Sequence, residues 1–162
     1  MKEPSSAKQL AAFIKRYSPE IAARARKVLA SMRQRLPGAV ELVYDNYNGL
    51  VIGFGPTDRP SDALFSIVLY PRWLTLFFLQ GAKLPDPQRL LKGGGKQVRH
   101  IRLSDATTLD EPGVRALMAE ALARAAVQFD EAARRRLIIK SASAAQRPRR
   151  HPQPAPGRQS TF

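Results

Sequence analysis

The chain of 162 residues has room for one domain and a terminal segment, and its net charge of +14 favours acidic partners. It contains no cysteine and only two histidines, which excludes disulfides, thiolate metal sites, a cysteine nucleophile and a structural zinc site. The N-terminal residues lack the apolar region of a signal peptide and no apolar run could cross a bilayer, so we expect a cytoplasmic protein without a membrane partner.

Two helices are predicted near the N-terminus. Residues 7–16 place apolar side chains at helical spacing. A second helix is expected to begin at Ser18, because serine followed by Pro19 and Glu20 is a typical helix start, and to end at the Pro37-Gly38 pair. Its apolar positions form one stripe, so we interpret its basic residues as a solvent-exposed face.

Five strands follow, and their short connections favour an antiparallel sheet in which neighbouring strands are consecutive in the chain. The predicted strands are residues 40–47, 50–54, 64–70, 73–79 and 98–103. Asn48-Gly49 is a strong signal for a two-residue turn between the first two strands. Pro71-Arg72 is expected to connect the third strand to the fourth.

Alternation along the third and fourth predicted strands gives each of them two apolar faces. The positions expected to face the helices are Phe65, Ile67, Leu69, Leu74, Leu76 and Phe78. The opposite face receives Leu64, Val68, Tyr70, Trp73, Phe77 and Leu79. The second face of such a sheet is usually polar. We therefore expect this one to be covered by a helix, to form a ligand groove, or to be the interface of a homodimer.

The C-terminal part of the domain is predicted to be one long helix, capped by Thr108 or Asp110, whose apolar stripe runs from Val114 to Phe129. The fold class expected is α+β: an antiparallel sheet of about five strands, two N-terminal helices and one long C-terminal helix. This domain would span residues 6–140.

Residues 141–162 are rich in Pro, Arg, Gln, Ser and Ala and are predicted to form a disordered basic tail. Eight basic residues and no acidic residue follow Glu131. Any non-specific contact with nucleic acid or another polyanion is therefore expected to go through this tail. We also expect that deleting the tail leaves the melting temperature within about one or two degrees of the starting value.

The loop before the fifth strand contains the run Lys92-Gly-Gly-Gly-Lys96. Glycines allow backbone N–H groups to converge on an oxyanion, and the lysines supply charge. The spacing is not that of a phosphate-binding P-loop, because Gln97 stands where serine or threonine is required. A flexible turn explains the glycines as well.

The candidate ligand-binding residues are Lys96, His100, Arg102, Trp73 and Phe77. His100 and Arg102 share one face of the fifth strand and supply charge with Lys96, while the two aromatic residues supply an apolar wall. Together they predict a shallow surface that accepts an anionic small molecule. The alternative is that the charges only prevent a sheet edge from pairing with another molecule.

No catalytic, metal-binding or cofactor-binding set is predicted. His100 has no serine or acid placed by the sequence to orient it. Glu41 and Asp45 form the one carboxylate pair that shares a strand face with tyrosines nearby, but the potential of a basic protein opposes cation entry. We therefore expect weak iron binding at most.

Several of these segments resemble the bacterial YdhG-like family, a domain of unknown function. The resemblance covers about residues 6–130, and its specific elements are Leu36-Pro37, Val43-Tyr44, GAKLPDP from Gly81, LLKGGGK from Leu90 and RHIR from Arg99. It implies a small α/β domain with an antiparallel sheet and flanking helices. Most members have no assigned activity, one branch is described as frataxin-like iron chaperones, and no catalytic residue set carries over.

Residues and resemblance together predict a non-catalytic binding module for an anionic ligand or partner. The alternative is an intracellular iron chaperone, and an enzyme of unknown type ranks third.

Overall fold

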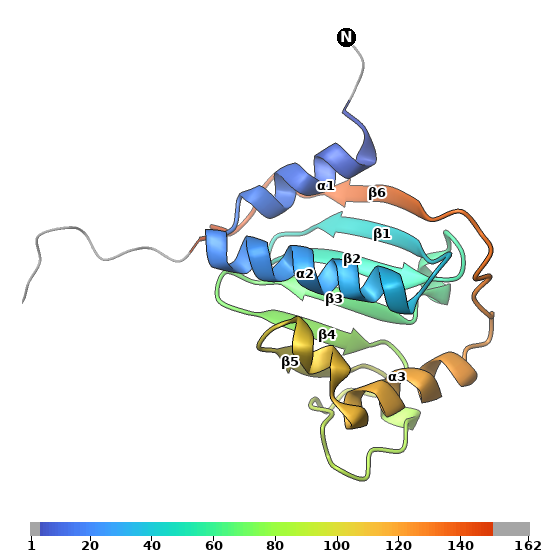
Figure 1. The fold of residues 1–162 in the computed structure, drawn as a ribbon. Coiled ribbons are helices and arrows are strands. Elements are labelled where there is room, and N and C mark those ends of the chain that lie inside the picture. The colour runs from blue at the N-terminus through green and yellow to red at the C-terminus, as the bar shows by residue number, and fades with distance from the viewer. Residues whose placement is uncertain (1–3, 151–162) are drawn as a thin grey trace, which may run out of the picture.

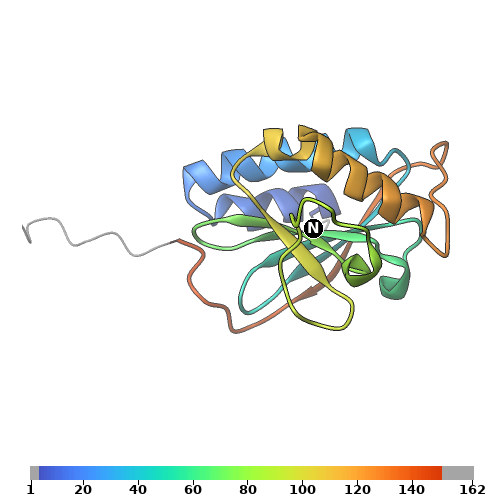
Figure 2. The same cartoon turned by 90° about the horizontal axis from the view of Figure 1, so that it is seen from below.

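The computed structural model describes residues 4–150 as an α+β fold with one six-stranded mixed sheet and three α-helices on one of its faces (Figures 1 and 2). The strand order is β5-β4-β3-β2-β1-β6. The helices are α1 (Ser6–Lys15), α2 (Pro19–Arg35) and α3 (Pro112–Ala123). The strands are β1 (Val40–Asp45), β2 (Leu50–Gly55), β3 (Phe65–Leu69), β4 (Leu74–Phe78), β5 (Arg99–Leu103) and β6 (Arg136–Ala142).

The two predicted N-terminal helices are present and begin at serine caps. The Ser5 hydroxyl accepts a hydrogen bond from the backbone N–H of Lys8, and that of Ser18 accepts one from Ile21. Both helices pack their apolar stripes against the sheet. In the part of the chain that the structure describes, no helix is long and apolar enough to cross a membrane.

Strands β1 to β5 form the predicted antiparallel series of neighbours. The six positions expected to face the helices are fully buried in the core, with Phe65 and Phe78 in edge-to-face contact. Period-two alternation therefore identified the inner face of the central strands correctly.

The predicted C-terminal helix is present, with Val114, Leu117, Met118 and Ala121 buried, but its predicted length is wrong. Helix α3 ends at Ala123, and Phe129 packs against the core from an irregular segment instead of a helix. The chain then passes so close to Gly38 that a side chain there would collide with the backbone oxygen of Asp130. This passage brings residues 136–142 to the free edge of β1.

At that edge, residues 136–142 form β6, which is parallel to β1. Leu137 and Ile139 pack against the core, and the ladder satisfies backbone groups that β1 would otherwise leave exposed. The sheet is therefore mixed and has six strands, not about five antiparallel ones.

The predicted disorder of the tail is wrong for residues 141–150. Ser141 and Ala142 belong to β6, and Ser143 donates its backbone N–H to the carbonyl of Asp45. Further along, the backbone N–H of Arg147 donates to Tyr47, and the buried side chain of Arg149 forms an ion pair with Asp45. The rest of that expectation, on residues 151–162, lies outside the described residues.

Tyr17 joins the helical layer to the sheet through a buried hydroxyl. This hydroxyl donates to the carbonyl of Leu69 at 3.0 Å and accepts from the N–H of Leu50 at 3.1 Å. A Tyr17→Phe variant leaves both backbone groups without this partner. We expect it to lower the free energy of unfolding by about 1–3 kcal/mol, measured by urea denaturation.

The pH dependence of this variant gives a second test. Burial raises the pKa of Tyr17 from 10.0 to about 12. A pKa raised in the folded state contributes stability that is complete below pH 10 and is lost as the pH rises through 12. The stability difference between wild type and Tyr17→Phe should therefore shrink in this alkaline range. Tyr47→Phe, which removes a hydroxyl from an exposed side chain, should change stability little at any pH.

Candidate functional site on the open face of the sheet

Within residues 4–150, no α-helix lies on the second face of the sheet. Figure 2 shows α1, α2 and α3 on the same side, and their buried residues belong to one core with the inner strand positions. The expectation that a helix covers the second face is thus wrong. A ligand groove and an interface with a second copy remain as interpretations of this open face.

Two pairs of planar side chains lie on the open face where β4 meets β5: Phe77 with His100, and Trp73 with Arg102. We call them the ring pairs. The strand register places Phe77 directly opposite His100, and their ring centroids are 5.5 Å apart. The register also places Arg102 opposite Thr75, from where its guanidinium reaches over the Trp73 ring, 4.4 Å from the centroid. Four of the five predicted ligand-binding residues are therefore side by side.

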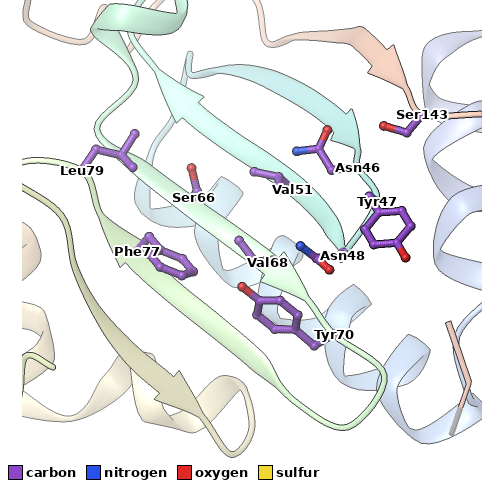
Figure 3. Close-up of a pocket in the computed structure, with 11 residues that line it drawn as sticks. Asn46, Tyr47, Asn48, Val51, Ser66, Val68, Tyr70, Phe77, Leu79 and Ser143 are labelled. Atoms are coloured by element: carbon purple, nitrogen blue, oxygen red, sulfur yellow. The ribbon is translucent and has the colours of Figure 1, made fainter. Parts of the chain in front are cut away.

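A shallow groove of about 570 Å³ extends from Phe77 across the open faces of β3 and β2 (Figure 3). Val51 and Val68 form its apolar floor and Ser66 contributes a hydroxyl. Tyr47 and Tyr70 stand at one end. No charged residue lines the groove among the described residues. Burial raises the pKa of Tyr70, so its hydroxyl remains protonated at neutral pH and can donate a hydrogen bond.

A second hollow, of about 810 Å³, adjoins the groove and shares Asn48 and Tyr70 with it. We call it the arginine cleft, because three arginines line it together with Pro71, Trp73 and Pro148: Arg72, Arg147 and Arg150. No carboxylate lines either hollow within residues 4–150. An apolar groove therefore leads into a cleft whose described lining is rich in arginine.

The loop before β5 is shaped by residues of the quoted motifs. The Asp86 carboxylate accepts hydrogen bonds from the N–H groups of Leu90 and Leu91, and Gly81 leaves no room for a side chain beside Arg99. Lys92 then exchanges two backbone hydrogen bonds with His100, at 2.8 and 2.9 Å. These residues have a structural role, because they fix the loop against the outer edge of β5, the strand at one end of the sheet.

Lys96 lies apart from the other four predicted site residues. It is exposed in the turn after Gly94 and Gly95, and it makes no hydrogen bond or ion pair within the described part of the chain. Only Gly93 in the glycine run has a left-handed backbone, with φ of 112°, which explains one of the three glycines. Arg147 and Arg150 were predicted to contact polyanions only as part of a disordered tail, so their place in an ordered cleft was not predicted.

The carboxylate pair considered for iron lies on the opposite, helix-covered face. Glu41 and Asp45 share a strand face as predicted, but they are four residues apart, about 13 Å along the strand, so one ion cannot contact both. Glu41 is paired with Arg33 and Arg135, and Asp45 with Arg16 and Arg149. No cluster of three or more potential ligands to a metal ion occurs among the described residues.

No protein-family model matches this chain, and neither does any curated protein or solved structure. The YdhG-like resemblance therefore remains a prediction from the motifs.

Proposed function

We propose that this protein is a non-catalytic binding module that holds an anionic ligand on the open face of the sheet. The observation that carries the proposal is the continuity of the apolar groove with a cleft that is lined, within residues 4–150, by three arginines and no carboxylate. The apolar floor contributes buried area, and the guanidinium groups select for negative charge. In this assignment His100 contributes its ring, since its side chain has no hydrogen-bonded acid or hydroxyl within residues 4–150.

The sequence predicted polyanion contact through the tail as a whole. In this proposal the contact is made by particular arginines of the cleft. Arg149 is buried against Asp45 and is unable to reach an external phosphate. Arg147 and Arg150 are exposed and line the cleft. They act from an ordered surface, together with Arg102 on β5.

A charge-matched pair of variants tests this proposal with inorganic polyphosphate as the probe. We expect the Arg102→Gln, Arg147→Gln double variant to bind polyphosphate more weakly. The slope of log affinity against log salt should become less steep by roughly 0.7–0.9 for each arginine, because each one that contacts a phosphate releases a counterion. Isothermal titration at several salt concentrations measures both quantities.

The matched control is the Arg26→Gln, Arg115→Gln double variant. It removes the same charge from exposed positions on α2 and α3, on the other side of the molecule. It should bind with nearly the wild-type slope. Equal losses in both double variants would show that polyphosphate responds only to net charge, and the proposed site would be rejected.

A further inference from the structure

We infer that the ligand of the open face is single-stranded nucleic acid, with bases stacked on the two ring pairs and phosphates held in the arginine cleft. This inference rests on the proposed function and specifies its ligand class. It takes the aromatic residues as contact surfaces in their own right, not only as an apolar wall.

The ring pairs offer flat surfaces at which unpaired bases can stack. Phe77, His100 and Trp73 are all partly exposed, and the exposed Arg102 lies with its guanidinium over Trp73. Bases stack on aromatic rings and equally on the plane of an arginine guanidinium. Trp73 and Phe77 are four residues apart, or about 13 Å along the strand. The face therefore provides two separate stacking positions in line with β4.

The surroundings of these positions suit base edges and phosphates. Ser66, Asn46 and Asn48 bring hydroxyl and amide groups to the groove, and such groups can donate to or accept from a base edge. At the end of the groove Arg147 lies over the Tyr47 ring, 5.6 Å from its centroid, so one arginine of the cleft also borders the groove. A nucleic acid strand that runs from the ring pairs to the arginine cleft would thus place its bases on rings and its phosphates beside cations.

Charge also distinguishes this occupant from a second copy of the chain. Two copies docked through the open face would bring two arginine clefts together. Neither cleft has a carboxylate in its described lining, and each belongs to a chain of net charge +14. Juxtaposed like charges oppose such an interface. Duplex nucleic acid is a poorer match, because its bases are stacked inside the helix and are not available to the ring pairs.

The single tryptophan of the chain allows a direct test, because Trp73 lies in the inferred site. The full-length protein is titrated with oligothymidylate of about ten nucleotides, and with an abasic sugar-phosphate strand of the same length and charge. We expect oligothymidylate to quench the tryptophan fluorescence and to bind roughly five- to a hundredfold more tightly for each stacked base. The abasic strand should bind weakly and leave the fluorescence unchanged.

Phe77→Leu isolates the stacking contribution, since leucine keeps the apolar volume but not the aromatic plane. It should weaken oligothymidylate binding at least fivefold and leave abasic binding unchanged. Phe13→Leu makes the same change on the helix-covered side, where the ring packs against the core, and should not alter binding. Melting curves of both variants confirm that each is folded at the assay temperature.

The outcomes separate this inference from the proposed function. Equal binding of oligothymidylate and the abasic strand would overturn base stacking, and so would equal binding of the duplex that oligothymidylate forms with oligodeoxyadenylate. Anion binding would survive both results. Polyphosphate binding without any oligonucleotide binding would reject nucleic acid as the ligand and leave the proposed function standing. Failure of all these probes, polyphosphate included, would reject the inference and the proposed function together.

Discussion

Replacing Arg149 by methionine should lower the free energy of unfolding by about 3–5 kcal/mol, one of the two largest effects expected for a single substitution in this protein. Arg149 and Asp45 are almost fully buried, with 2.8 Å between Nη2 and Oδ1. The variant leaves the Asp45 carboxylate buried with Arg16 as its one remaining partner, a half-exposed side chain at 3.4 Å. A buried charge without its partner keeps its desolvation cost, which is why the loss is large.

Urea denaturation of the full chain measures this loss, and two variants interpret it. Arg150→Met changes the neighbouring exposed arginine and should cost less than about 1 kcal/mol. The Asp45→Asn, Arg149→Met double variant should recover part of the loss, because no buried charge is left unpaired. A change below about 1 kcal/mol in Arg149→Met would contradict the docking of residues 143–150.

The same ion pair decides whether the arginine cleft exists. Arg149 also donates to the carbonyls of Asn46 and Tyr47, so it holds the last described residues against the turn between β1 and β2. Arg147 and Arg150 flank it and line the cleft. A chain that ends at Ala142 should therefore bind polyphosphate more weakly and melt at a lower temperature than one that ends at Arg150.

The second large effect is expected at Arg33. Glu41 is completely buried and accepts three hydrogen bonds from the Arg33 guanidinium, at 2.8, 3.1 and 3.1 Å. Arg33→Met removes all three and should cost about 3 kcal/mol, the lower part of the range for a broken buried pair, because Arg135 still lies 3.6 Å from Glu41. Urea denaturation measures the change, and Arg33→Lys should recover only part of it, since lysine cannot bind in a bidentate manner.

Arg35→Met provides the control for Arg33 within the same helix. Arg35 pairs with Asp110, whose carboxylate is mostly exposed, with a side-chain exposure of 66%. An exposed pair contributes little, so this variant should lose less than about 1 kcal/mol. Equal losses in Arg33→Met and Arg35→Met would show that both substitutions destabilise helix α2 itself. The buried pair with Glu41 would then not explain the loss.

Local patterns in the sequence were sufficient for the helices α1 and α2, for the pairing of β1 with β2 and for the inner face of β3 and β4. Each of these depends on the spacing of side chains within a few residues, which is visible without knowing the partner elements. That Phe77 and His100 belong to neighbouring strands was accessible for the same reason. Their direct pairing was not, because alternation gives the face of each residue but not the register across the long connection from β4 to β5. The two-residue turn predicted at Asn48-Gly49 is wrong in detail, because β1 ends at Asp45, Asp45 lies opposite Leu50, and Gly49 has no positive φ.

Long-range pairings were not accessible. Leu137, Ile138 and Ile139 form an apolar run too short to distinguish a strand from a helix end, and their partner β1 lies far away in the sequence. The stripe attributed to a long helix included Phe129 because an irregular segment can bury an aromatic ring as well as a helix can. No spacing rule links Arg149 to Asp45, so the composition of its neighbours predicted disorder where the structure has a buried ion pair.

The sequence by itself determined the alternating strands, the capped helices and four residues of the candidate site, because these follow from backbone periodicity and from side chains that are close in the chain. Only the tertiary structure decided that the second sheet face stays open, that β6 completes the sheet, and that arginines from the C-terminal segment meet Tyr70 and Trp73 in one cleft. These features arise where distant segments bury the same surface or neutralise the same charge, and the free energy of such contacts depends on a proximity that folding alone creates.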